Sequence, residues 1–239
     1  MVTDDPWTNL RRWTSARIAL GRAGTSLPTK PLLEFELAHA RARDAVLRPC
    51  GFTGLEGLAV RSRADHRLEY LRRPDLGRLL HPESERLLEG AATTWGWDVG
   101  LVVGDGLSSL AVDRHAATLL AHLVPRLREA GFRSSPLVLA TQARVALSDE
   151  IGSRLQVDLV VLLIGERPGL TSPDSLGVYL TWAPRRGRQN AERNCVSNIR
   201  PGGLGFPEAA DTVLALARGA RLLGESGIRL KEDTWLADS

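Results

Sequence analysis

A carboxylate directly follows the most apolar stretch of the chain. Residues 159–164 are six branched aliphatic residues without a polar interruption, and they lead into segment 165–169, Gly-Glu-Arg-Pro-Gly. Such a run is typical of a strand buried on both faces of a parallel sheet. Ligands of open α/β sheets bind at the carboxyl ends of the strands, which is where Glu166 is expected to lie. A carboxylate can accept hydrogen bonds from amides there, and the alternative is a structural ion pair with Arg167 or Arg144.

The two cysteines, Cys50 and Cys195, are too few for a disulfide framework or for a zinc site of their own. This number favours a reducing, cytoplasmic setting. Cysteine is often a small buried hydrophobe. Cys195, however, is flanked by the uncharged donors and acceptors Asn194, Ser197 and Asn198. These neighbours favour a less ordinary role for Cys195.

Segment 104–109, Gly-Asp-Gly-Leu-Ser-Ser, nearly matches the dinucleotide-binding fingerprint. It follows an apolar run and opens a helical pattern, as that fingerprint requires. The third glycine is replaced by Ser109, however, and Gln142 stands where a ribose-binding acid is expected. Asp105 would also repel a pyrophosphate. The segment is therefore interpreted as a tight strand-to-helix turn near another ligand.

A second partial motif is Asp113-Arg114-His115. Proteins that bind cobalamin with its lower base displaced often carry Asp-x-His-x-x-Gly, but here Thr118 replaces the glycine. The tripeptide also lies inside a predicted helix, so His115 is interpreted as an ordinary helix residue. The other histidines are scattered without metal-pair spacing. We therefore predict no metal site, and the sequence shows no pattern of a catalytic site.

Composition and charge exclude two classes of partner. The net charge is +3 and the pI about 9.3, yet all but Lys30 and Lys231 of the 31 basic residues are arginines interspersed with acids. This pattern indicates GC-rich codon usage instead of the basic patch of a nucleic-acid-binding protein. The longest apolar run has six residues, far short of the roughly 20 that a membrane span needs. The acidic N-terminus carries no apolar signal region.

The order of apolar and turn-forming segments predicts the fold. Residues 1–94 are interpreted as a smaller helical region: a helix with Thr29 as N-cap, and a connecting layer over 51–90 that is rich in glycine and proline. From residue 95 onward, strands alternate with helices. This predicts an α/β fold with a doubly wound, mostly parallel sheet of the Rossmann or flavodoxin kind over 95–239. The predicted strands are 98–103, 136–140, 159–164 and 177–182, and the predicted helices are 110–130 with a kink or break at Pro125, 148–155 with Ser148 as N-cap, and 207–224.

Several of these segments, taken together, resemble a known family. The chain is similar to the small (light) subunit of bacterial ethanolamine ammonia-lyase, in order and along nearly its whole length. The Gly-Glu-Arg-Pro-Gly segment and the Cys-x-Ser-Asn-Ile segment are long and specific. The segments that carry the resemblance are 12–24, 39–46, 104–108, 165–170, 175–179 and 195–199.

The resemblance implies a subunit of a radical enzyme that depends on adenosylcobalamin. Such enzymes convert ethanolamine and related vicinal amino alcohols to an oxo compound and ammonia. In this family the large subunit is a (β/α)8 barrel that holds the substrate, and the small subunit covers the lower side of base-on cobalamin. Residues 1–94 would then dock on the large subunit, and residues 95–239 would cover the cobalamin. A higher-order hetero-oligomer is implied, active only with the large subunit and located in the cytoplasm or inside a bacterial microcompartment.

Three cobalamin contacts carry over from the family, namely Val145, Glu166 and Cys195. Cobalamin offers an apolar ring edge for Val145 and neutral propionamides for Glu166, so its pocket needs interleaved apolar and polar contacts. One departure lies beside Val145, because 141–143 is Thr-Gln-Ala where the family often has a glycine before the Arg-Val pair. The segment 50–52 has no counterpart that can be placed.

Two other classes of function remain as alternatives. A free-standing nucleotide- or flavin-binding regulatory module would bind its ligand as an isolated chain. A structural assembly or targeting chain would dock through its helical N-terminal part and bind no cofactor. The lyase-subunit interpretation instead predicts little cobalamin binding until the large subunit is present.

Overall fold

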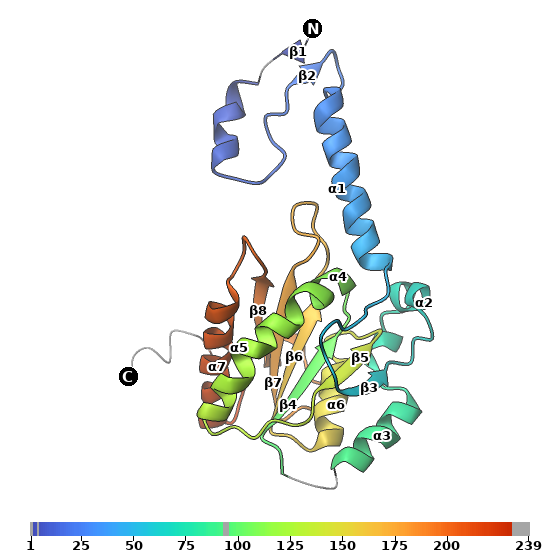
Figure 1. The fold of residues 1–239 in the computed structure, drawn as a ribbon, viewed down its shortest axis with the longest axis vertical. Helices are drawn as coiled ribbons and strands as arrows, with labels where there is room; N and C mark the ends of the chain where they lie inside the picture. Colours follow the sequence, from blue (N-terminus) through green and yellow to red (C-terminus); the bar gives the residue numbers. More distant parts are fainter. Residues whose placement is uncertain (1, 4, 93–95, 231–239) are drawn as a thin grey trace.

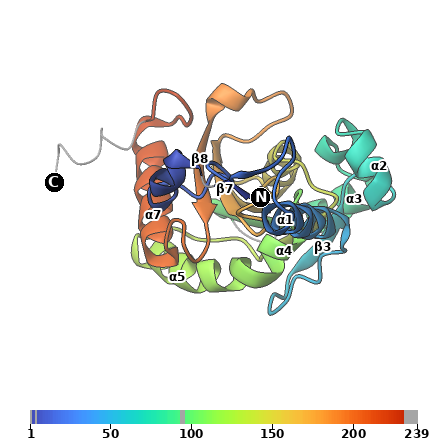
Figure 2. The same ribbon diagram turned by 90° about the horizontal axis from the view of Figure 1, so that it is seen from above.

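The computed structural model describes residues 2–3, 5–92 and 96–230, which form an α/β body and a projecting N-terminal arm (Figure 1). The long helix α1 (Thr29–Leu47) joins the arm to the body and contacts the body beside α4 (Figure 2). Its outer part is a short 3-10 helix and a two-stranded antiparallel pairing. These elements are β1 (Val2–Thr3), η1 (Pro6–Arg12) and β2 (Arg22–Ala23).

The body is built on a mixed sheet of six strands within the described residues, mostly parallel and covered by helices on both sides. This confirms the predicted α/β class. The strands β3, β5, β4 and β6 run parallel, whereas β7 and β8 are antiparallel to their neighbours. In spatial order the strands are β3 (Leu58–Arg61), β5 (Val138–Thr141), β4 (Val99–Gly104), β6 (Leu159–Gly165), β7 (Leu176–Trp182) and β8 (Arg193–Ile199).

Both edges of the sheet differ from the sequence-based expectation. The edge strand β3 comes from the segment 51–90, which was interpreted as a connecting layer, and β8 was not predicted at all. The strand at 176–182 exists, but it pairs antiparallel to β6. The connection from β6 to β7 spans only residues 166–175, which is too short for the crossover helix that a parallel strand requires. The domain boundary predicted between residues 94 and 95 lies outside the described residues.

The helices form two layers. On one face lie α4 (Ser109–Ala111), the π-helical η3 (Val112–Ala116), α5 (Ala117–Glu129) and α7 (Phe206–Leu223). On the other lie α3 (Pro82–Ala92) and α6 (Leu147–Leu155). The short helices α2 (Arg67–Arg72), η2 (Leu76–Arg78) and η4 (Asn190–Glu192) occupy connections.

Of the two alternatives predicted at Pro125 the break is not observed and the kink stays a prediction, and two other local predictions about these helices are wrong. Pro125 lies inside α5 and does not break it, because buried leucines on both sides of Pro125 pack the helix onto the sheet. Thr29 is the first residue of α1, whose N-cap is Pro28. Ser148 lies inside α6, where its hydroxyl donates to the Val145 carbonyl (2.8 Å), so the helix begins at Leu147.

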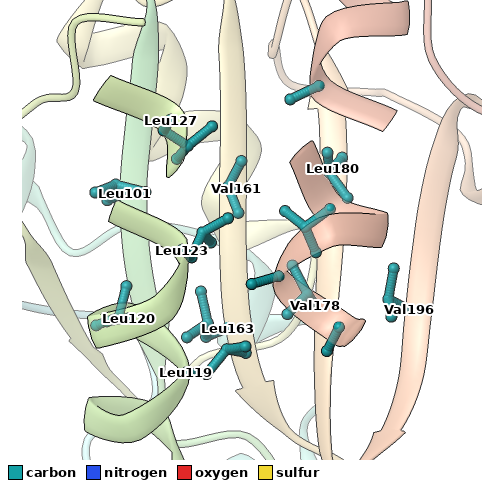
Figure 3. Packing of buried hydrophobic residues seen from close by; sticks show 14 of the residues in the cluster. Leu101, Leu119, Leu120, Leu123, Leu127, Val161, Leu163, Val178, Leu180 and Val196 are labelled. Carbon is teal, nitrogen blue, oxygen red and sulfur yellow. The ribbon is translucent and has the colours of Figure 1, made fainter. Parts of the chain in front are cut away.

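Apolar packing fixes the sheet between the two layers. On the first face, leucines of α5 pack over alternate residues of β4 and β6, and α7 packs over β7 and β8 (Figure 3). Leu162 and its neighbours on the opposite face pack against α6. Because residues 159–165 are buried on both faces, the continuous apolar run was a reliable sign of a central strand.

The topology places a crevice at the carboxyl edge of the sheet. The chain leaves β4 on the face that α5 covers, and it leaves the neighbouring β5 on the face that α6 covers. Neighbouring strands whose connections go to opposite faces create the topological switch point at which α/β proteins bind ligands. The ends of β4, β5 and β6 therefore frame the expected position of a site.

Candidate functional site

Asp105, at the end of β4, holds the loop that follows β5. Its carboxylate is buried and accepts hydrogen bonds from the backbone N–H groups of Gln142 and Ala143, both at 2.9 Å. Arg67 of α2 approaches the same carboxylate at 3.3 Å. Burial raises the pKa of Asp105, and Arg67 and the backbone donors act in the opposite direction. Gln142 adopts a left-handed backbone conformation (φ 56°). The two hydrogen bonds to Asp105 stabilise this turn, so the carboxylate has a structural role and does not bind a phosphate.

Two glycines allow the turn after β4 to touch the end of β6. A Cβ on Gly165 would lie 2.0 Å from the Ser108 carbonyl oxygen, and one on Gly106 would lie 2.2 Å from the Gly165 oxygen. Gly106 also has a positive φ of 59°. The N–H of Leu107 donates to the Gly165 oxygen at 2.9 Å. The tight strand-to-helix turn predicted for 104–109 is therefore confirmed.

Arg144 is held in place by a stack of side chains. Its guanidinium lies 4.3 Å from the ring centroid of the buried Tyr70, and Arg67 lies 4.8 Å from the same ring. The Tyr70 hydroxyl donates to the Ala143 carbonyl at 2.9 Å, and the Arg144 N–H donates to the Gly77 carbonyl at 2.8 Å. The stack fixes the backbone next to Val145, although no glycine precedes the Arg-Val pair.

Glu166 lies at the end of β6, as predicted, and is half-buried. One carboxylate oxygen, Oε2, accepts hydrogen bonds from the Ser175 hydroxyl and from the Asn198 backbone N–H (3.2 Å). Gly177 lies directly beneath the side chain, because a Cβ there would come within 2.9 Å of Oε1. Within the described residues Glu166 forms no ion pair and Oε1 has no hydrogen-bond donor. The structural ion pair with Arg167 or Arg144 is thus not what the structure shows.

Cys195 of β8 faces Tyr179 of β7 in the sheet register. Partial burial of the thiol raises the pKa of Cys195 although the residue is exposed overall, Glu166 raises it further, and a hydrogen bond with Tyr179 lowers it. Burial, followed by the nearby Cys195 and Glu166, also raises the pKa of Tyr179. At neutral pH both groups are therefore uncharged.

Two adjoining cavities bring the predicted site residues together. The smaller cavity, of about 450 Å³, lies at the ends of β4, β5 and β6 and includes Val145 and Glu166. The larger cavity, of about 750 Å³, lies beside β8 and includes Val145 and Cys195. Both are lined by Arg144, Val145 and Tyr179, so the three sequence-predicted residues surround one continuous region.

Sequence reasoning missed the contribution of Tyr179 and treated Arg144 only as an ion-pair partner. Tyr179 is an aromatic residue with a polar hydroxyl within an otherwise apolar strand, and this feature of the sequence could have indicated a role in the site.

The remaining candidate residues lie outside the two cavities. Cys50 packs near Asp113, and the buried His115 contacts Asp174 at 3.3 Å, as expected of an ordinary helix residue. Among the described residues, no cluster of His, Cys, Asp or Glu could hold a metal ion.

The fold and the site define an α/β protein that offers a ligand pocket at the carboxyl edge of its sheet. The family model described as ethanolamine ammonia-lyase light chain (EutC) matches residues 4–231. The chain is 52% identical over 242 residues to the ethanolamine ammonia-lyase small subunit of Ralstonia nicotianae, covering 97% of this chain and 90% of the relative. It is 51% identical over 247 residues to that of Azotobacter vinelandii, covering 99% and 92%. The chain belongs to the ethanolamine ammonia-lyase light-chain family, as its sequence motifs predicted.

The raised pKa of Cys195 gives a testable expectation. The thiolate is the species that reacts with iodoacetamide, so Cys195 should be alkylated more slowly at pH 7.5 than a cysteine in a short peptide, despite its exposure. The rate should keep rising above pH 9. Mass spectrometry of the Cys195 peptide distinguishes it from Cys50, whose burial raises its pKa to about 12. A rate that levels off below pH 8.5 would contradict this assignment.

Proposed function

We propose that the chain forms, together with an ethanolamine ammonia-lyase large subunit, the pocket for base-on adenosylcobalamin. In this way it takes part in the deamination of ethanolamine and related vicinal amino alcohols to an oxo compound and ammonia. The observation that supports the proposal most strongly is that Val145, Glu166 and Cys195 lie around two adjoining cavities. These are the three positions that correspond to cobalamin contacts of the family.

The residues present fit the chemistry of a corrin ring with neutral amide side chains. The smaller cavity combines apolar surface from Leu107, Val145 and Ile164 with the unpaired Oε1 of Glu166. An amide N–H can donate to that oxygen. Arg144 lines the same wall, where its guanidinium is stacked on Tyr70. Because buried polar groups must be paired, a ligand with both amide donors and amide acceptors suits this wall.

The roles of this chain's residues are binding and positioning. Val145 would contact the ring edge, Glu166 would accept from an amide, and the uncharged Cys195 would place a small polarisable group beside the ligand. Asp105 and Tyr70 would keep the loop of Val145 in position. When bound, the cofactor supplies the radical that takes a hydrogen from the substrate.

The N-terminal arm suits a second polypeptide. Trp7 and Trp13 on the arm are 65% and 78% exposed, and α1 exposes Leu33, Phe35 and Leu37. A large apolar surface of this kind usually marks a protein–protein interface. If a large subunit docks there within a higher-order hetero-oligomer, this surface is covered only in the assembled enzyme. This agrees with the expectation that the chain is active only with the large subunit.

None of the helices in the described residues combines the length and hydropathy that a membrane crossing requires. A location in the cytoplasm or inside a microcompartment stays a prediction.

Co-expression with and without the large subunit tests the proposal. The co-purified complex should bind cyanocobalamin in a visible-spectrum titration and should release acetaldehyde from ethanolamine once adenosylcobalamin is added. The isolated chain should bind cyanocobalamin weakly or not at all. A complex that binds no cobalamin would contradict the proposed cofactor. An isolated chain that binds FMN or a nucleotide tightly would favour the regulatory-module alternative.

A further inference from the structure

The larger cavity is strongly cationic, unlike the smaller one beside it. Its lining contains more arginines than acids, whereas the three positions that correspond to cobalamin contacts are one carboxylate and two uncharged side chains. A neutral amide-rich ring does not require such a surplus of positive charge. The charged residues that line the cavity are Arg78, Arg144, Arg186, Arg188, Arg193, Asp149 and Glu150.

Part of this charge is neutralised within the protein. Arg193 and Asp149, whose side chains are each 2% exposed, form a buried ion pair. Arg186 donates to Glu150 at 2.6 Å. Arg188 is bonded to Glu192 and to the carbonyl of Ala183. The two acids that line the cavity, Asp149 and Glu150, are therefore already paired and cannot neutralise a further arginine.

The buried pair is itself incompletely satisfied. Asp149 Oδ1 and Arg193 Nε are buried without a hydrogen-bond partner among the described residues. Burial raises the pKa of Asp149 to about 6, against the opposing effect of Arg193. Because these atoms are shielded from solvent, the Asp149–Arg193 pair supports the wall of the cavity and offers no free donor to a ligand.

Two arginines remain for an external anion. The exposed guanidinium of Arg78 has no partner among residues 2–3, 5–92 and 96–230. Arg144 stands in the wall shared by the two cavities, where stacking on Tyr70 fixes the plane of its guanidinium and Nη1 has no partner among the described residues. Guanidinium groups bind phosphate oxygens through paired, charge-assisted hydrogen bonds.

We propose that the larger cavity binds the phosphodiester of the cobalamin nucleotide tail, with Arg78 and Arg144 as its donors. This inference rests on the proposed function, because a base-on cobalamin carries its tail on the lower side that this chain would cover. The tail holds the phosphate group of an otherwise amide-rich molecule. The smaller cavity therefore suits the amide side chains of the ring, and the adjoining cationic cavity suits the phosphate of the tail.

The test compares two corrinoids in the complex with the large subunit. Cyanocobalamin carries the nucleotide tail, and dicyanocobinamide has the same ring without it. Arg78→Gln removes one exposed charge and leaves the Tyr70 stack intact. The expected result is a rise in the Kd of cyanocobalamin of about tenfold, the size of one lost charge-assisted hydrogen bond, with an unchanged Kd for dicyanocobinamide. Both are read from the visible spectrum without turnover.

A matched control and a competitor sharpen the result. Arg128→Gln removes an exposed, unpartnered arginine from α5 on the opposite face and should leave both Kd values unchanged. Inorganic phosphate should weaken cyanocobalamin binding by the wild-type complex more than by the Arg78→Gln complex. An Arg78→Gln complex that binds cyanocobalamin like wild type, or that weakens for both corrinoids equally, overturns the inference. A wild-type complex that binds neither corrinoid overturns the proposed function.

Discussion

Replacing Asp105 by alanine is expected to lower the free energy of unfolding by about 3–5 kcal/mol, the range for removing one partner of a buried ion pair. The substitution leaves Arg67 without its carboxylate and leaves the N–H groups of Gln142 and Ala143 without an acceptor. Arg67 keeps two backbone acceptors, Val46 and Leu107, so the lower half of that range is expected.

Thermal and urea unfolding of the purified protein measure this effect. For a chain of this size the midpoint should fall by about 10 °C, since each kcal/mol corresponds to roughly 2–4 °C. Asp105→Asn keeps the volume but places an amide against a backbone N–H, so it should also destabilise. Asp75→Ala is the control, because Asp75 forms an exposed pair with Arg73. A loss below about 1 kcal/mol for Asp105→Ala would show that the loop after β5 is held by other contacts.

The sequence predicted the part of the fold that depends on local pattern. The run at 159–164 is buried on both faces and could only be a central strand, and Glu166 therefore had to lie at the sheet edge. The positions of Val145 and Cys195 were available from the family resemblance alone. Their convergence with Glu166 depends on long-range pairing of β6, β7 and β8, which no single segment encodes.

The errors share one cause, namely tertiary contacts that override local preference. β8 is buried at every third residue instead of every second one, and it contains asparagines that disfavour strands, yet pairing with β7 makes it a strand. β3 is only four residues long and was hidden among glycines and prolines. The cationic cavity was missed because Arg78 and Arg144 are 66 positions apart, and only η2 and the loop after β5 bring them together.

Glu166→Ala is expected to raise the Kd of cyanocobalamin for the two-subunit complex by roughly ten- to hundredfold, the effect of removing a half-buried carboxylate that accepts from a ligand amide. The fold should change little, because water can enter the space that the carboxylate leaves beside the cavity and accept from the Ser175 hydroxyl and the Asn198 N–H. Circular dichroism and the unfolding midpoint check the fold, and the visible-spectrum titration gives the Kd. Glu129→Ala, on the opposite face, is the matched control.

Gly177→Ala tests the same carboxylate without removing it. The new Cβ would lie 2.9 Å from Oε1 of Glu166, and a carboxylate at the end of a flexible side chain can move away at small cost to stability. The unfolding midpoint should therefore stay close to wild type while the Kd of cyanocobalamin rises several-fold.

The double variant Gly177→Ala/Glu166→Ala should bind no more weakly than Glu166→Ala alone, because both changes act through one group. Additive effects on the Kd would mean that Gly177 acts on the ligand by another route, and an unchanged Kd in Glu166→Ala would remove Glu166 from the binding site.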